Sequence, residues 1–318
     1  MYRSHPSLRL DISRAPALLV LAAVLLAGCG AAGSGGRGSG PPSDTEATEV
    51  VATTTVLADL VRQVGGKHVN VSSLVPPGGE VHTFDPTPAD IARVADADLV
   101  VMNGLGLDDW VADLASDSGS TASTIRVGED LEGVTYLAPD NHEALAVNPH
   151  VWMDVRNGIR YAVRIGDELA RIDGANATSY RDLTKTYTQR LTDLDTWTRE
   201  LIAAVPPDRR QVISFHDAFP YFAAAYGLEI VGTVIDAPGQ DPSAGEIAGL
   251  IDEIRASGAS ALFGEAQFNP ELARTIAEEA GIAVVTDLYT DSLGDAPADT
   301  YEGMIRSDVE KVVEALQP

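Results

Sequence analysis

Cysteine is nearly absent, because Cys29 is the only one in a chain of 318 residues. A disulfide within the chain is therefore impossible, and the folded body is not built on a redox framework. Beyond the first thirty residues no apolar run reaches the length that spans a membrane. With 45% hydrophobic and 22% charged residues, the body of the chain has the composition of a water-soluble globular protein.

Standard hydrolase motifs are also missing. The sequence contains neither a phosphate-binding P-loop nor a Gly-x-Ser-x-Gly nucleophile turn. His142 and Glu143 resemble the start of the zinc-protease helix motif, but Ala146 stands where that motif needs its second histidine. We therefore expect no enzyme of these classes.

Basic residues are scarce relative to acidic ones. The chain has 22 Lys and Arg against 47 Asp and Glu, and its formal net charge is −25. Such a charge argues against nucleic acid and anionic lipid as partners, whereas it raises the local concentration of cations. It does not select one cation, so selectivity requires a defined site.

The N-terminal segment is predicted to be an export signal. Three arginines precede the apolar run 15–27, and the residues Leu26-Ala27-Gly28-Cys29 resemble a bacterial lipoprotein signal. We expect residues 1–28 to be removed and Cys29 to be lipidated, which would anchor the protein on the extracytoplasmic side of the membrane. A plain signal peptide or a short anchor helix is the alternative. Residues 29–48, rich in Gly, Ser and Pro, are predicted to be a flexible tether.

The remaining sequence alternates between short β-branched or apolar runs and segments of helical periodicity. This alternation predicts an α/β fold with mainly parallel sheets flanked by helices. It occurs twice, separated by a stretch with few helix breakers. We predict an N-terminal lobe at 49–175, one linking helix at 176–205 that ends before Pro206-Pro207, and a similar C-terminal lobe at 206–318.

Three of the six histidines lie where loops or strands lead into helices. His82 sits in a loop rich in Pro and Gly, His150 follows Pro149, and His216 directly follows the predicted strand 211–215. Asp287 directly follows the predicted strand 282–286. Ligands gather at the carboxyl ends of strands in open α/β sheets, so we hypothesise one metal site made of these four residues.

Five further motifs occur in order along the chain: Val75–Pro86, Asn103–Trp110, Asn148–Asp154, Phe215–Phe222 followed by Tyr226–Leu228, and Glu265–Gln267. With them the chain resembles the zinc/manganese substrate-binding lipoproteins of bacterial ABC importers, and the resemblance covers nearly all of residues 50–318.

The resemblance implies that His82, His150, His216 and Asp287 are the metal ligands, two from each lobe, so that the metal would hold the lobes together. It also implies a membrane permease as partner and a metal-binding rather than an enzymatic role. We expect Glu265 to support the ligands through hydrogen bonding rather than to ligate, and Trp152 and Trp110 to pack at the lobe interface rather than to bind a ligand. We expect the protein to be a monomer.

The predicted donors favour Zn²⁺ as the transported metal. Three imidazoles and one carboxylate suit tetrahedral zinc, whereas manganese prefers more oxygen donors. Manganese-binding relatives usually have glutamate at the position of His216, and the histidine-rich loop of many zinc-binding relatives is represented here only by His142. Mn²⁺ or Fe²⁺ as cargo, a surface zinc metallohydrolase and a metal-stabilised adhesin are the alternatives.

Overall fold

A computed structural model describes residues 47–139, 146–235, 238–240 and 242–317. The predicted signal segment, the predicted lipidation site Cys29, nearly all of the predicted tether and His142 lie outside the described residues. Residues 47–317 belong to one compact unit. Among the described residues, no helix combines the length and the apolar character needed to cross a membrane.

The N-terminal lobe is built on a four-stranded parallel sheet with the strand order β2-β1-β3-β4. Strand β1, one of the two inner strands, contains the β-branched residues Val50 and Val51. The elements are β1 (Thr48–Ala52), α1 (Thr55–Gly65), the 3₁₀ helix η1 (Gly66–His68), β2 (Val69–Ser73), α2 (Pro88–Ala95), β3 (Leu99–Met102), α3 (Trp110–Ser118), β4 (Ser123–Arg126), the 3₁₀ helix η2 (Val151–Met153) and α4 (Val155–Ile172).

A second parallel sheet of the same topology forms the C-terminal lobe, with the order β6-β5-β7-β8. Its elements are the 3₁₀ helix η3 (Pro207–Arg209), β5 (Gln211–Ser214), α6 (Pro220–Tyr226), β6 (Glu229–Thr233), α7 (Ala244–Ser257), β7 (Ala261–Glu265), α8 (Pro270–Ala280), β8 (Ala283–Leu288) and α9 (Tyr301–Leu316).

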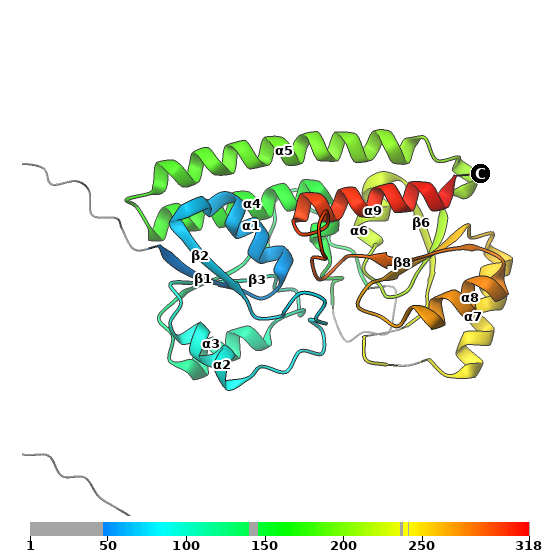
Figure 1. Cartoon of the computed structure of the whole chain (residues 1–318), viewed down its shortest axis with the longest axis horizontal. Coiled ribbons are helices and arrows are strands. Elements are labelled where there is room, and N and C mark those ends of the chain that lie inside the picture. Colours follow the sequence, from blue (N-terminus) through cyan, green and yellow to red (C-terminus); the bar gives the residue numbers. More distant parts are fainter. Residues whose placement is uncertain (1–46, 140–145, 236–237, 241, 318) are drawn as a thin grey trace, which may run out of the picture. The chain divides into compact units, whose positions relative to one another are not determined.

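The long helix α5 (Ala177–Ala203) runs beside both sheets (Figure 1). It packs against α1 and α4 of the first lobe and against α6 and α9 of the second. A short turn separates α4 from α5. In this turn the Asp173 carboxylate accepts hydrogen bonds from the Asn176 amide at 2.7 Å and from the Tyr180 hydroxyl at 2.8 Å. The predicted linking helix is therefore present, with ends within one or two residues of those expected.

One large apolar core crosses from lobe to lobe. It includes Val50 and Leu60 from the N-terminal lobe, Tyr187 from α5, and Phe263 and Val309 from the C-terminal lobe. A smaller separate cluster lies in each lobe. Because the shared core would have to be exposed to separate the lobes completely, this arrangement favours small relative movements of the lobes.

Candidate metal centre

His216 lies just beyond the end of β5, at the point where the strand order of the C-terminal sheet reverses. The chain passes from β5 to β6 on one side and then crosses to β7 on the other, which creates a crevice at the carboxyl ends of β5 and β7. Glu265, the last residue of β7, occupies the other side of this crevice. Its Oε1 lies 2.6 Å from His216 Nδ1, and both side chains are buried. This contact directs Nε2 of His216 away from Glu265 and leaves it available as a ligand.

His150 is held by a short turn that leads into η2. The Asn148 side-chain oxygen accepts from the backbone N–H of His150 and also lies 3.0 Å from its Nδ1. The amide nitrogen of Asn148 donates to the Asp217 carbonyl at 2.7 Å, so the orientation of the Asn148 amide is fixed by its partners. Nδ1 of His150 therefore carries the proton, and its Nε2 is free to ligate.

His82 comes from the loop between β2 and α2, and its side chain is 11% exposed. The backbone N–H of His82 donates to Glu80 Oε1 at 2.9 Å, which braces the loop near the ligand. Burial raises the pKa of Glu80, and the negative charge of Asp291 adds to the effect. Glu80 therefore adds another carboxyl group to the surroundings of the site.

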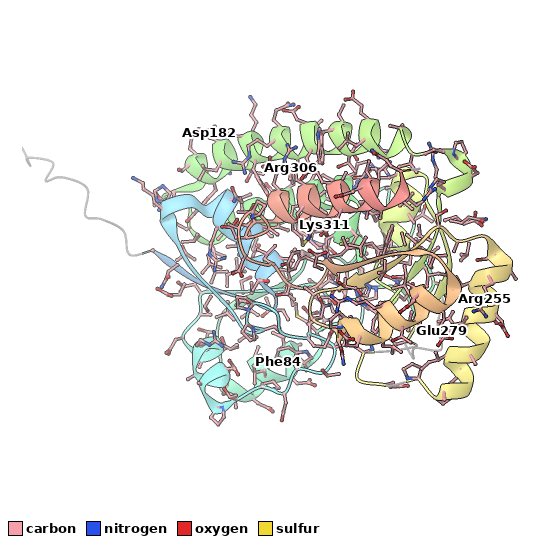
Figure 2. All side chains as sticks on the ribbon, turned by 45° about the vertical axis from the view of Figure 1, so that its right-hand side comes forward. Phe84, Asp182, Arg255, Glu279, Arg306 and Lys311 are labelled. Atoms are coloured by element: carbon pink, nitrogen blue, oxygen red, sulfur yellow. The ribbon has the colours of Figure 1, made fainter. Side chains whose placement is uncertain are left out.

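The fourth residue that the structure groups with the three histidines is Asp291, which corrects the expectation that Asp287 would join them. Strand β8 extends two residues beyond the predicted end, so Asp287 lies within the strand rather than after it. Its side chain is 61% exposed and pairs with Lys311 at 2.8 Å; Lys311 projects from α9 in Figure 2. Asp291 lies in the loop that follows β8, and its side chain is fully buried.

The four donor atoms form a compact group in which all lie within 4.8 Å of one another. His150 Nε2 is 3.3 Å from the Nε2 atoms of both His82 and His216. The Asp291 oxygens lie 3.4 Å from Nε2 of His150 and of His216, and 3.7 Å from that of His82. A tetrahedron with metal–nitrogen bonds of about 2.0–2.1 Å has edges of about 3.3–3.4 Å, so the spacing fits a four-coordinate ion.

The Asp291 carboxylate supports the same assignment. Neither of its buried oxygens has a hydrogen-bond partner among the described residues. A buried charge without hydrogen bonds is costly unless a cation compensates it, and the surrounding imidazoles supply only partial compensation. The donor set therefore suits a divalent metal ion.

The pKa values of His150 and His216, the two most deeply buried histidines of the group, are shifted in opposite directions. Burial lowers the pKa of His150 well below its usual value, although the Asp291 carboxylate opposes this shift. Burial acts in the same direction on His216, but the carboxylates of Glu265 and Asp291 outweigh it and hold the pKa of His216 well above its usual value. Without metal, His216 therefore carries a proton near neutral pH that an incoming cation must displace.

The two buried carboxyl groups are shifted in opposite directions. Burial would raise the pKa of Asp291, but the three surrounding histidines hold it well below its usual value. Burial raises the pKa of Glu265, and the adjacent His216 opposes this rise. Asp291 is thus the ionised carboxylate that faces the donor group, while Glu265 lies behind His216.

The structure brings the three predicted histidines together and groups Asp291 with them, and it shows the contact of Asn148 with His150, which the sequence did not indicate. Leu288 follows Asp287 directly and is buried, and its pairing with Glu265 of β7 extends the strand past Asp287. His68 lies outside the group, where its ring contacts that of Tyr180. Trp152 bridges the lobes, because its indole N–H donates to the Thr290 carbonyl at 3.0 Å. Trp110, which was also expected at the lobe interface, contacts the ring of Phe84 in its own lobe.

Comparisons with known proteins agree over nearly the whole described chain. The model of the family described as periplasmic zinc-uptake complex component A matches residues 50–315. The manganese-binding lipoprotein MntA of Halalkalibacterium halodurans is 28% identical over 301 residues, which cover 94% of this chain and 97% of that protein. The manganese ABC transporter substrate-binding lipoprotein PsaA of Streptococcus pneumoniae is 26% identical over 307 residues, with the same coverage of the two chains.

Solved structures confirm the predicted two-lobe α/β fold. The periplasmic zinc-binding protein TroA of Treponema pallidum superposes with a TM-score of 0.77 at 26% identity, covering 86% of this chain and 100% of that chain. A manganese-bound periplasmic metal-binding protein from Candidatus Liberibacter asiaticus gives a TM-score of 0.76 at 24% identity, covering 85% of this chain and 100% of that chain. The second likeness supports the fold alone.

Proposed function

The chain belongs to the family of periplasmic zinc-uptake components, and on this premise we propose that it captures a divalent metal ion, preferably Zn²⁺, for a membrane ABC permease. His82, His150, His216 and Asp291 would be the ligands. The observation that carries the proposal is the convergence, at tetrahedral spacing, of three Nε2 atoms and one buried carboxylate that accepts no hydrogen bond from the described residues. Two ligands come from each lobe, so metal binding would couple the lobes.

The donor chemistry favours zinc, because three neutral imidazoles and one carboxylate form a typical four-coordinate zinc site. Mn²⁺ is the second candidate, since MntA and PsaA are named for manganese. Manganese usually takes more oxygen ligands, which the four protein donors would not supply without solvent. The same scaffold would serve either cargo.

We also propose a binding rather than a catalytic role. Four protein ligands would fill a tetrahedral zinc site, whereas a catalytic zinc keeps one position open for water. Attachment to the extracytoplasmic face of the membrane through Cys29 completes the proposal. The relatives named as lipoproteins of ABC transporters support it.

Metal competition tests the proposal. The purified protein would be stripped of metal and titrated with Zn²⁺ and with Mn²⁺ against chelators that set equal free concentrations. We expect tighter binding of Zn²⁺, and weak binding of both ions to a His150→Ala variant. The control is His68→Ala, which removes a histidine outside the group. A clear preference for Mn²⁺ would overturn zinc as cargo, and equal affinity of His150→Ala and the wild type would overturn the site.

A further inference from the structure

Asp291 belongs to the C-terminal lobe by sequence, but its neighbours in the chain are bonded to the N-terminal lobe. The segment between β8 and α9 passes beside α1 before α9 begins (Figure 1). Three hydrogen-bonding groups from the N-terminal lobe hold the residues on either side of Asp291. These contacts bear directly on how firmly the carboxylate is held in the proposed site.

Ser292 makes the first of these contacts. Its hydroxyl accepts a hydrogen bond from the backbone N–H of Gly78 at 2.7 Å, and Gly78 lies in the same loop as His82. The Ser292 hydroxyl also lies 3.3 Å from Oγ1 of Thr55, at the first turn of α1. The Thr55 oxygen in turn accepts from the backbone N–H of Leu293 at 2.8 Å.

Trp152 makes the contact on the other side. Its indole N–H donates to the Thr290 carbonyl, and Trp152 lies two residues after His150. Residues 290, 291 and 292 are all buried. The ligand Asp291 is therefore held between one contact to the loop of His82 and one contact to the turn of His150.

From this arrangement we propose that Ser292, Thr55 and Trp152 are positioning residues that fix Asp291 against the N-terminal lobe and thereby slow the release of metal. The inference rests on the proposed metal-binding function. Withdrawal of the Asp291 carboxylate from its place would require these hydrogen bonds to stretch or break. The indole N–H of Trp152 and the backbone N–H of Leu293 are buried donors, and leaving either without a partner adds to the barrier, so the contacts act mainly on the dissociation rate.

The test measures metal dissociation after mixing the zinc-loaded protein with excess chelator in a stopped-flow instrument. Ser292→Ala should release Zn²⁺ about tenfold faster than the wild type, whereas Ser292→Thr, which keeps the hydroxyl, should restore most of the slow release. Trp152→Phe keeps the ring but removes the indole donor, and it should accelerate release to a similar extent.

A double-mutant cycle separates positioning from general loosening of the fold. Ser292→Ala and Thr55→Val each remove one of the two hydroxyls that contact each other. Their effects on the dissociation rate should therefore be less than additive. Ser292→Ala and Trp152→Phe act on opposite sides of Asp291 and should come closer to additivity. Thr198→Val, which removes a buried hydroxyl on α5 away from this segment, is the control and should release metal at the wild-type rate.

The outcomes distinguish this inference from the proposed function. Wild-type protein that holds zinc, together with unchanged dissociation rates in Ser292→Ala and Trp152→Phe, would overturn the positioning role alone. Failure of the wild type to bind zinc would instead overturn the proposed function. If Ser292→Ala does not fold, Thr55→Val and Trp152→Phe carry the test, and unchanged rates in both would refute the inference.

Discussion

The two lobes share one strand order, yet they contribute to the proposed site in different ways. In the C-terminal lobe, His216 and its partner Glu265 lie where the strand order reverses. In the N-terminal lobe, the donors His82 and His150 come from loops outside the corresponding crevice. The matching topology therefore does not produce matching halves of the site.

The supporting groups differ as well. A carboxylate contacts Nδ1 of His216, whereas the neutral amide oxygen of Asn148 contacts Nδ1 of His150. The Asp291 carboxylate also comes from the C-terminal lobe, whereas burial raises the pKa of Glu80, the carboxyl group on the N-terminal side. We therefore expect the C-terminal side to dominate the affinity for a cation, while the N-terminal side contributes orientation.

Among the variants that test this asymmetry, removal of the His216 side chain should weaken Zn²⁺ binding most. His216→Ala should weaken Zn²⁺ binding by more than about 100-fold, because it removes a ligand and separates Glu265 from its partner. His82→Ala should cost less, since His82 is the most exposed donor and water can take its place. Chelator competition measures both. Thermal unfolding without metal checks the folding of each variant, and equal losses would break the comparison.

Glu265→Gln should have the next largest effect. It keeps the shape of the side chain but removes the charge beside His216, and groups that orient metal ligands typically contribute about 10- to 100-fold to affinity. We expect a loss of Zn²⁺ affinity near the upper end of that range, measured by the same competition. An affinity equal to that of the wild type would show that Glu265 has only a structural role.

Asn148→Ala removes the corresponding support from the N-terminal side. The amide is neutral, so we expect a loss near the lower end, about tenfold. Titration calorimetry would measure this variant beside Glu265→Gln. A loss larger than that of Glu265→Gln would contradict the proposed division between charge on one side and orientation on the other.

Acidification should weaken metal binding by at most about tenfold per pH unit around neutrality. The pKa of His216 is raised, so this residue binds a proton below its shifted pKa, and that proton competes with the metal. The pKa of His150 is lowered, so it is already neutral and adds no dependence in this range. Zn²⁺ affinity at pH 6, 7 and 8 would check the slope. Constant affinity across this range would contradict a protonated His216.

The fold, and the positions of the three histidines that the structure brings together, could be predicted because each rests on a local signal. Proline and glycine fix the loops around His82 and His150, and a β-branched strand leads directly to His216. The two similar lobes follow from the repeated alternation of strands and helices. These features depend on neighbouring residues, which the sequence displays.

Asp287 was predicted in place of Asp291 because the end of β8 depends on tertiary packing. Thr286 is the last β-branched residue of the run, but Leu288 is buried and pairs with Glu265 of β7, which extends the strand. The contacts that hold Asp291 join residues more than 130 positions apart. No local pattern in the sequence specifies such contacts.

The most direct test of the proposed site compares Asp291→Asn with Asp287→Asn. Both changes remove one carboxylate charge from an aspartate at nearly the same place in the chain, but Asp287 forms an exposed ion pair with Lys311, a kind of pair that contributes little. In chelator competition, Asp291→Asn should lose more than about 100-fold in Zn²⁺ affinity, because a buried charged partner is removed. Asp287→Asn should bind like the wild type. Equal affinities of the two variants, or a greater loss in Asp287→Asn, would contradict the site described here.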